Sequence, residues 1–137
     1  MSLEEDNRAL VARALNLLAY IAQPGKTREY LDLFSDDMTW WVAGDVVGGQ
    51  MDRAQYAAMI ENIPAILSAP FVFTVTGWTC QGDRVAVEAV GKTVLKDGRP
   101  YENLLHLLYI VRGGKIVAGK EYLDTARSAA AFMPPPH

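Results

Sequence analysis

The first part of the chain shows apolar residues at helical spacing. Apolar side chains recur every three or four positions from Leu10 to Ile21, until the sequence QPG interrupts the pattern. Ser2 and Glu5 have the spacing of a capping box, which satisfies free N–H groups at the start of a helix. This segment therefore predicts a helix over about residues 3–22.

Two further helices are predicted on either side of a short strand. Thr27 can cap the second helix, which we expect to end before the sequence SDD. The sequence MTWWVAG, residues 38–44, is typical of a strand. Asp52 and Gln55 form another capping pair, so a third helix begins there and has Pro64 near its end. We interpret the glycine-rich sequence GDVVGG as a mobile rim.

The second half of the chain consists of strand-like runs rich in β-branched and aromatic residues. These runs cover residues 71–79, 84–95, 101–111 and 115–123. The sequences between them, QGD, KDGRP and RGG, have the glycine and aspartate of hairpin turns. We therefore expect four consecutive strands in an antiparallel meander. The fold class is α+β, with the helices packed on the concave face of a curved sheet.

The strand expected at residues 101–111 has apolar side chains on both faces, because alternate residues of a strand point to opposite sides. The inward face holds Tyr101, Asn103, Leu105, Leu107 and Tyr109. The outward face holds Glu102, Leu104, His106, Leu108 and Ile110. The helices can cover only one face, so the outward face needs another cover. We therefore expect a homodimer that forms through the convex face of the sheet.

The last hairpin decides which residues surround Glu121, and two registers are compatible with its sequence RGG. The first register has a three-residue loop with Gly114 in the left-handed conformation. Leu105 then lies opposite Glu121. Asn103 lies opposite Leu123 and is a diagonal neighbour of Glu121.

The second register has a two-residue loop and places His106 opposite Glu121. The residues alone do not decide between the two. We favour the first register because it forms a polar pair, Asn103 and Glu121, inside an apolar row, as small-molecule pockets do to orient a ligand. Gly91 on the neighbouring strand then leaves space for that ligand beside Glu121.

Composition narrows the classes of function. The 137 residues and the net charge of −3 are typical of one globular domain, 1–137, with a short flexible tail from about residue 130. Neither a basic nucleic-acid surface nor a membrane segment is present in the sequence. Cys80 is the single cysteine and fits a cytoplasmic protein. His106 is the one histidine in the folded body, so we expect no metal site and no cofactor.

The order of these elements and two sequences resemble the SnoaL-like branch of the NTF2-like superfamily. The two sequences are FSDDMTWWVAG and DGRPYENLLHLLYIVRGGKIVAGKEYLDT. The resemblance implies a cystatin-like α+β cone that is open at one end and is usually dimeric. It also implies relatives that include polyketide cyclases, ketosteroid isomerases, epoxide hydrolases and dehydratases.

At one position, this sequence has a residue that matches a catalytic residue of these relatives. The two aspartates of ketosteroid isomerases correspond to positions near Val42 and Leu107, which are apolar here. The arginine and aspartate of limonene epoxide hydrolases correspond to Ala89 and Gly91. Their third catalytic element, an acid on the last strand, corresponds to Glu121.

The sequence therefore predicts a protein that binds a small apolar or polycyclic molecule in its cone. One hypothesis is a cofactor-independent isomerase, cyclase or dehydratase with Glu121 as its acid/base. The alternative is a non-catalytic, dimeric ligand-binding or scaffold module, in which Glu121 holds the barrel end closed. The residues that we expect to contact the ligand are Trp40, Tyr20, Tyr56, Gly91, Tyr101, Asn103, Leu105, Leu107 and Leu123.

Overall fold

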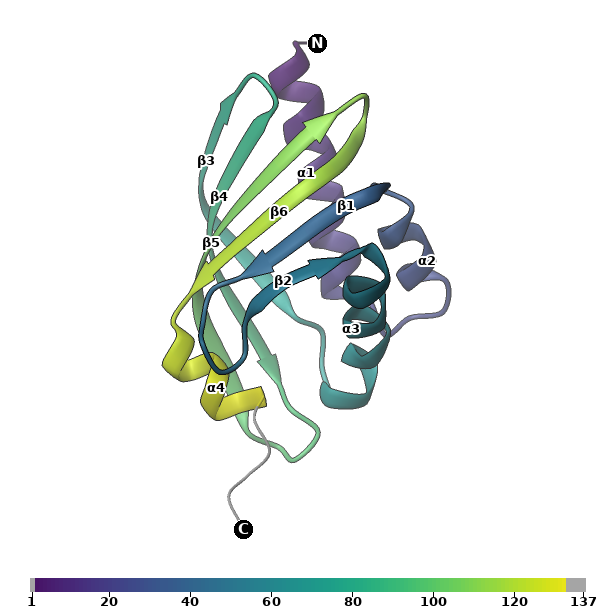
Figure 1. The fold of residues 1–137 in the computed structure, drawn as a ribbon. Helices are drawn as coiled ribbons and strands as arrows, with labels where there is room; N and C mark the ends of the chain where they lie inside the picture. The colour runs from purple at the N-terminus through teal and green to yellow at the C-terminus, as the bar shows by residue number, and fades with distance from the viewer. Residues whose placement is uncertain (1, 133–137) are drawn as a thin grey trace.

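The computed structural model describes residues 2–132, which form a curved sheet with helices on its inner side (Figure 1). The helices are α1 (Leu3–Ala19), α2 (Lys26–Leu31), α3 (Arg53–Ile66) and α4 (Thr125–Phe132). The strands are β1 (Phe34–Val42), β2 (Gly49–Asp52), β3 (Val72–Gln81), β4 (Arg84–Val94), β5 (Pro100–Arg112) and β6 (Lys115–Leu123). None of these helices is long and apolar enough to span a bilayer.

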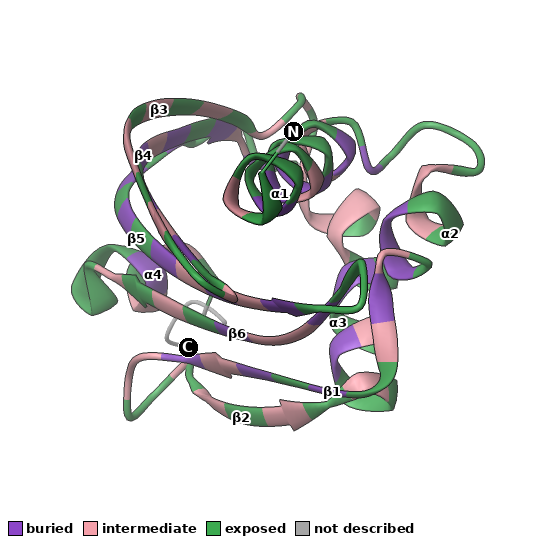
Figure 2. Ribbon diagram, turned by 90° about the horizontal axis from the view of Figure 1, so that it is seen from above, coloured by how far each residue is buried: buried purple, intermediate pink, exposed green. Residues whose placement is uncertain are grey.

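The sheet has the strand order β2-β1-β6-β5-β4-β3. Figure 2 shows that the sheet curves strongly and that α1 and α3 lie on the inside of the curve. The predicted α+β class and the helices on the concave face are confirmed, as is the antiparallel meander from β3 to β6. In addition, β1 lies parallel to β6, a pairing that brings the first strand next to the last.

Local capping explains where two of the helices begin. The Ser2 side chain accepts a hydrogen bond from the backbone N–H of Glu5, at 3.1 Å. Asp52 and Gln55 form the predicted capping box at the start of α3. The prediction for the second helix is wrong in its cap. Gly25 precedes α2 in the left-handed conformation, with φ 81°, and no side chain caps that helix.

Three element boundaries differ from those expected. The first helix ends at Ala19 rather than near residue 22. The sequence SDD does not end a helix but lies within β1, which begins at Phe34 because that residue already pairs with Ile116 of β6. Gly49, the last residue of the expected mobile rim, begins the short strand β2 (Gly49–Asp52), which pairs with β1 at the edge of the sheet through Trp40 and Met51.

The loop of the last hairpin contains two residues, Gly113 and Gly114, with φ of 60° and 75°. Both angles lie in the left-handed region that glycine adopts without strain. Arg112 therefore pairs directly with Lys115, and Val111 pairs with Ile116. The predicted three-residue loop is wrong.

A β-bulge then shifts the register of β6 by one residue. Val117 has no partner in β5, and beyond it Glu121 pairs with Leu107. Neither predicted partner of Glu121, Leu105 or His106, is correct. The shorter loop and the bulge each shift the register by one residue, and a total shift of two keeps Glu121 on the inward face that the first register assigned to it.

The end of the described chain is more ordered than expected. We predicted a flexible tail from about residue 130, yet residues 130–132 belong to α4. The helix packs against β5 and buries Ser128. Residues 133–137 lie outside the part of the chain that the structure describes.

Candidate functional site

A cavity of about 470 Å³ lies between the concave face of the sheet, α3 and α4. Most of the side chains that line it are aliphatic or aromatic. Glu121 is the only acid among the described residues of this lining, which include no lysine, arginine or histidine. Small-molecule sites have this character, with an apolar wall and few polar groups that orient the ligand.

The pairing of β1 with β6 places Glu121 beside Trp40. Val42 of β1 pairs with Glu121, and Trp40, two residues earlier, pairs with Gly119. The Trp40 Nε1–H donates a hydrogen bond to the Glu121 Oε1, at 3.2 Å. Gly119 makes room for the indole, because a Cβ atom at that position would overlap the ring of Trp40. These contacts fix one oxygen of the Glu121 carboxyl group.

The protonation of Glu121 depends on two opposing effects. Burial raises the pKa of the Glu121 carboxyl group above its ordinary value, because the charged form loses hydration in the apolar cavity. The hydrogen bond from Trp40 lowers the same pKa and is the smaller effect. The pKa of the Glu121 carboxyl group therefore lies closer to neutral pH than that of an exposed glutamate, as acid/base chemistry requires.

Tyrosine side chains form the wall behind Trp40. The hydroxyl groups of Tyr30 and Tyr56 lie 2.6 Å apart and share a hydrogen bond. The ring of Tyr56 stacks on Trp40, with centroids 4.8 Å apart and planes at 25°. Burial raises the pKa values of Tyr30, Tyr56 and Tyr109, so these groups are uncharged at neutral pH. The Trp40 ring is thus packed between the ring of Tyr56 and the backbone at Gly119.

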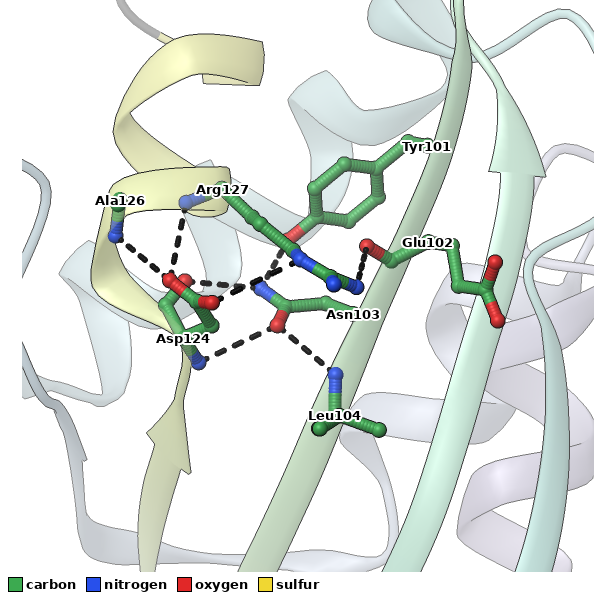
Figure 3. Close-up of polar contacts among 7 residues, drawn as sticks. All are labelled: Tyr101, Glu102, Asn103, Leu104, Asp124, Ala126 and Arg127. Atoms are coloured by element: carbon green, nitrogen blue, oxygen red, sulfur yellow. Dashed lines mark hydrogen bonds and ion pairs between the residues drawn. The ribbon is translucent and has the colours of Figure 1, made fainter.

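Asn103 connects the sheet to the start of the last helix (Figure 3) and is not part of the cavity lining. Its Nδ2 donates to the Tyr101 hydroxyl at 2.8 Å and to the Asp124 carbonyl at 3.1 Å. Its Oδ1 accepts from the backbone N–H groups of Leu104 and Asp124. Phe132 of α4 packs edge-on against Tyr101, with ring centroids 5.0 Å apart. This end of the cavity is therefore closed by α4.

Both ends of α4 are anchored by side chains. The Asp124 carboxylate accepts hydrogen bonds from the backbone N–H groups of Ala126 and Arg127, at 3.0 and 3.2 Å. At the other end, the Arg99 guanidinium donates to the carbonyl of Ala130, at 3.2 Å. Acceptors at the N-terminus and donors at the C-terminus satisfy the free backbone groups of a helix. The anchors explain why so short a helix forms here.

Most of the predicted site residues line the cavity. They are Trp40, Tyr56, Tyr101, Leu105, Leu107, Glu121 and Leu123. Three others, Tyr20, Gly91 and Asn103, are not part of its lining. Tyr20 follows α1 and is 42% exposed on another surface. The space beside Gly91 is filled by the ring of Phe71, and the amide of Asn103 is engaged in the network of Figure 3.

The cavity also contains residues that the sequence did not single out. Tyr109 follows Leu107 on the same inward row, so alternation along β5 alone could have identified it. Phe71 and Phe73 stack on each other at 4.9 Å and line the wall near β3. Phe132 lies in a helix that the sequence did not predict. Within residues 2–132, no group of three or more potential metal ligands comes together.

Comparisons with known proteins agree with this architecture. Residues 13–119 match the model of the SnoaL-like domain. A search of curated proteins found no match. An NTF2-like protein of unknown function from Burkholderia pseudomallei has a similar structure, with a TM-score of 0.80 and 16% identity. The alignment covers 98% of this chain and 100% of that one.

Two further crystal structures with this fold contain small molecules. A protein from Catenulispora acidiphila with a ketosteroid isomerase-like fold, in complex with trimethylamine, has a TM-score of 0.68, 22% identity and coverage of 89% and 93% of the two chains. TerC, co-crystallised with polyporic acid, has a TM-score of 0.75, 17% identity and coverage of 92% and 97%. The family match spans most of the sequence, and the topology agrees with it. The chain belongs to the SnoaL-like family and has the NTF2-like fold.

Proposed function

We propose that the protein binds a small, largely apolar molecule in the cavity and that Glu121 is the polar group that orients it. The observation that supports this proposal is the single acid in an otherwise apolar cavity of about 470 Å³. Ligand pockets in proteins have volumes of roughly 300–1,000 Å³ and a similar lining. Flat or polycyclic ligands suit the aromatic wall formed by Trp40, Tyr56 and Tyr109.

The hydrogen bonds of Glu121 favour a role toward a ligand over a role in closing the barrel. Trp40 donates the one side-chain hydrogen bond that Glu121 receives within the described part of the chain. A structural carboxyl group in the protein interior is usually satisfied at both oxygens. The closure of the barrel end depends instead on Asn103 and Asp124.

An acid/base reaction is the catalytic form of this proposal. A carboxyl group with a raised pKa can take a proton from a bound molecule and return it at another atom near neutral pH. Such a reaction, an isomerisation, a cyclisation or a dehydration, needs no cofactor. The two small molecules named for neighbours of this fold, trimethylamine and polyporic acid, are different compounds, so the fold by itself does not set the ligand.

The variant Glu121→Gln tests the proposal, because Gln keeps the shape of the side chain but cannot exchange the proton. A library of apolar small molecules would be screened by tryptophan fluorescence and by NMR against the wild type, Glu121→Gln and the control Glu61→Gln. Glu61 is exposed on α3 and does not line the cavity. We expect ligands whose affinity or turnover changes at Glu121→Gln alone. If no ligand of the wild type responds to this change, the proposed role of Glu121 is refuted.

We further propose that the chain forms a homodimer through the convex face of the sheet. The outward side chains there include Leu104, which is 59% exposed, and Tyr122, which is 43% exposed. Trp41 packs against Tyr122 with ring centroids 5.0 Å apart, so the apolar surface continues from β6 to β1. Contiguous apolar surface of this kind marks an interface in many soluble proteins.

A further inference from the structure

We infer that the ligand of the cavity is an apolar amine, bound in its protonated form, and that the Glu121 carboxylate is its counter-ion. This inference rests on the proposed function and adds the charge and the chemical class of the ligand. Two observations support it: Glu121 is the one charged side chain among the described residues of the cavity lining, and its Oε2 has no hydrogen bond within the described residues.

The charge balance of the cavity favours a cation. Glu121 takes part in none of the ion pairs of residues 2–132, all of which involve side chains on the surface. No lysine, arginine or histidine is among the described residues of the lining. A buried charge is stable only when a partner of opposite sign lies beside it. An anionic ligand would meet an uncompensated acid here, whereas an ammonium group would supply the missing partner.

The geometry of the carboxyl group leaves one oxygen available for this partner. The Trp40 Nε1–H is bonded to Oε1, while Oε2 has no hydrogen bond within the described residues. Among the described residues, Oε2 is not a buried atom sealed off without a partner, and Glu121 lines the cavity, so we infer that this oxygen is accessible from it. Because the indole N–H is held between Tyr56 and Gly119, the carboxyl group is oriented before a ligand arrives.

The other groups around Glu121 cannot replace the charge of its carboxylate. They come from four elements and are Tyr30 of α2, Trp40 of β1, Tyr56 of α3, and Tyr101 and Tyr109 of β5. The tyrosine hydroxyl groups of the cavity lining can accept a hydrogen bond from an ammonium, whereas the Trp40 N–H only donates. Burial raises the pKa values of all four tyrosines, so they stay neutral in the physiological range. The response of ligand binding to pH therefore reports on Glu121 and on the ligand alone.

Matched sets of probes test the inference. Each set has one apolar core, benzyl, naphthylmethyl or adamantylmethyl, and carries an amine, an alcohol or a carboxylic acid. Dissociation constants would be measured by tryptophan fluorescence and calorimetry for the wild type, Glu121→Gln and the control Glu61→Gln. We expect the amine of at least one set to bind about tenfold or more tightly than its alcohol, and the acid not to bind. In Glu121→Gln the amine and the alcohol should bind equally, while Glu61→Gln should behave as the wild type.

The pH dependence separates the two protonation states of Glu121. An ammonium binds the carboxylate, so its affinity should rise as the pH increases through the raised pKa of Glu121. A neutral ligand that accepts a hydrogen bond from the protonated acid would show the opposite trend. Alcohols that bind as tightly as their amines, or amine affinity that falls with rising pH, would overturn the inference and leave the proposed binding function intact. If no member of any set binds, the proposed binding function is overturned as well.

Discussion

Gly119 of β6 is the position at which the smallest change should disturb the candidate site. A Cβ atom built there lies 2.9 Å from the Trp40 Cη2 and still closer to two other atoms of the same ring. Trp40 is buried and stacked on Tyr56, so it cannot move away without loss of packing. Gly119→Ala should therefore displace the indole and weaken its hydrogen bond to Glu121.

The expected cost combines three effects. Overpacking of a filled core costs about 1–3 kcal/mol. Loss of a hydrogen bond to a charged group costs about 1.5–3 kcal/mol. Replacement of a strand glycine by alanine returns about 0.5–1 kcal/mol, because the unfolded chain loses freedom. We therefore expect the free energy of unfolding of Gly119→Ala to fall by roughly 1.5–5.5 kcal/mol.

Urea denaturation followed by tryptophan fluorescence would measure this change. Gly77→Ala is the matched control, because a Cβ atom on that strand glycine meets only the end of the flexible Glu88 side chain, at 3.1 Å. A double-mutant cycle with Trp40→Phe should give a coupling energy of about 1–3 kcal/mol, since the smaller ring makes room for the alanine. NMR titration should show a further rise of the Glu121 pKa in Gly119→Ala, because the hydrogen bond from Trp40 lowers that pKa. Stability within about 0.5 kcal/mol of the Gly77→Ala control, with an unchanged titration, would refute the reasoning.

Three further predictions concern pH, the last helix and assembly. Because the pKa of Glu121 is raised in the folded state, its contribution to stability is complete below the ordinary pKa of 4.5 and is lost as the pH rises through the folded pKa. In urea denaturation at several pH values, Glu121→Gln should abolish this decline in stability. An identical decline in the variant would contradict the assignment to Glu121. Asn103→Ala should lower the free energy of unfolding by about 2–4 kcal/mol, because two backbone groups of Asp124 lose their hydrogen-bond partner, and it should speed hydrogen exchange in α4. Asn16→Ala, at an exposed site, is the control, and unchanged exchange in Asn103→Ala would argue against the anchor. Sedimentation should give twice the 15.1 kDa chain mass for the wild type and a monomer or an unfolded chain for Leu108→Glu, and a monomeric wild type would exclude the dimer.

The sequence by itself determined those features that depend on neighbours within a few residues. The caps of Ser2 and Asp52 are hydrogen bonds over three positions, so the starts of α1 and α3 could be predicted. The alternation of β5 likewise assigned Leu105, Leu107 and Tyr101 to the inward face. The face of Glu121 was also predicted, although both predicted pairings were wrong, because the two-residue loop and the bulge each shift the register by one residue and the total shift of two keeps the face.

Only the tertiary structure decided what surrounds Glu121. Trp40 reaches Glu121 because β1 lies parallel to β6, a contact between residues 81 positions apart that no local pattern encodes. The space beside Gly91 looked open in the sequence but is filled by the ring of Phe71, which directly precedes β3, the strand that pairs with β4. Asn103 looked like a ligand-binding amide, yet the chain turns back after β6 and uses it to hold α4. Such contacts depend on how separate elements pack, and their energies become defined only when the sheet has curved and closed around the cavity.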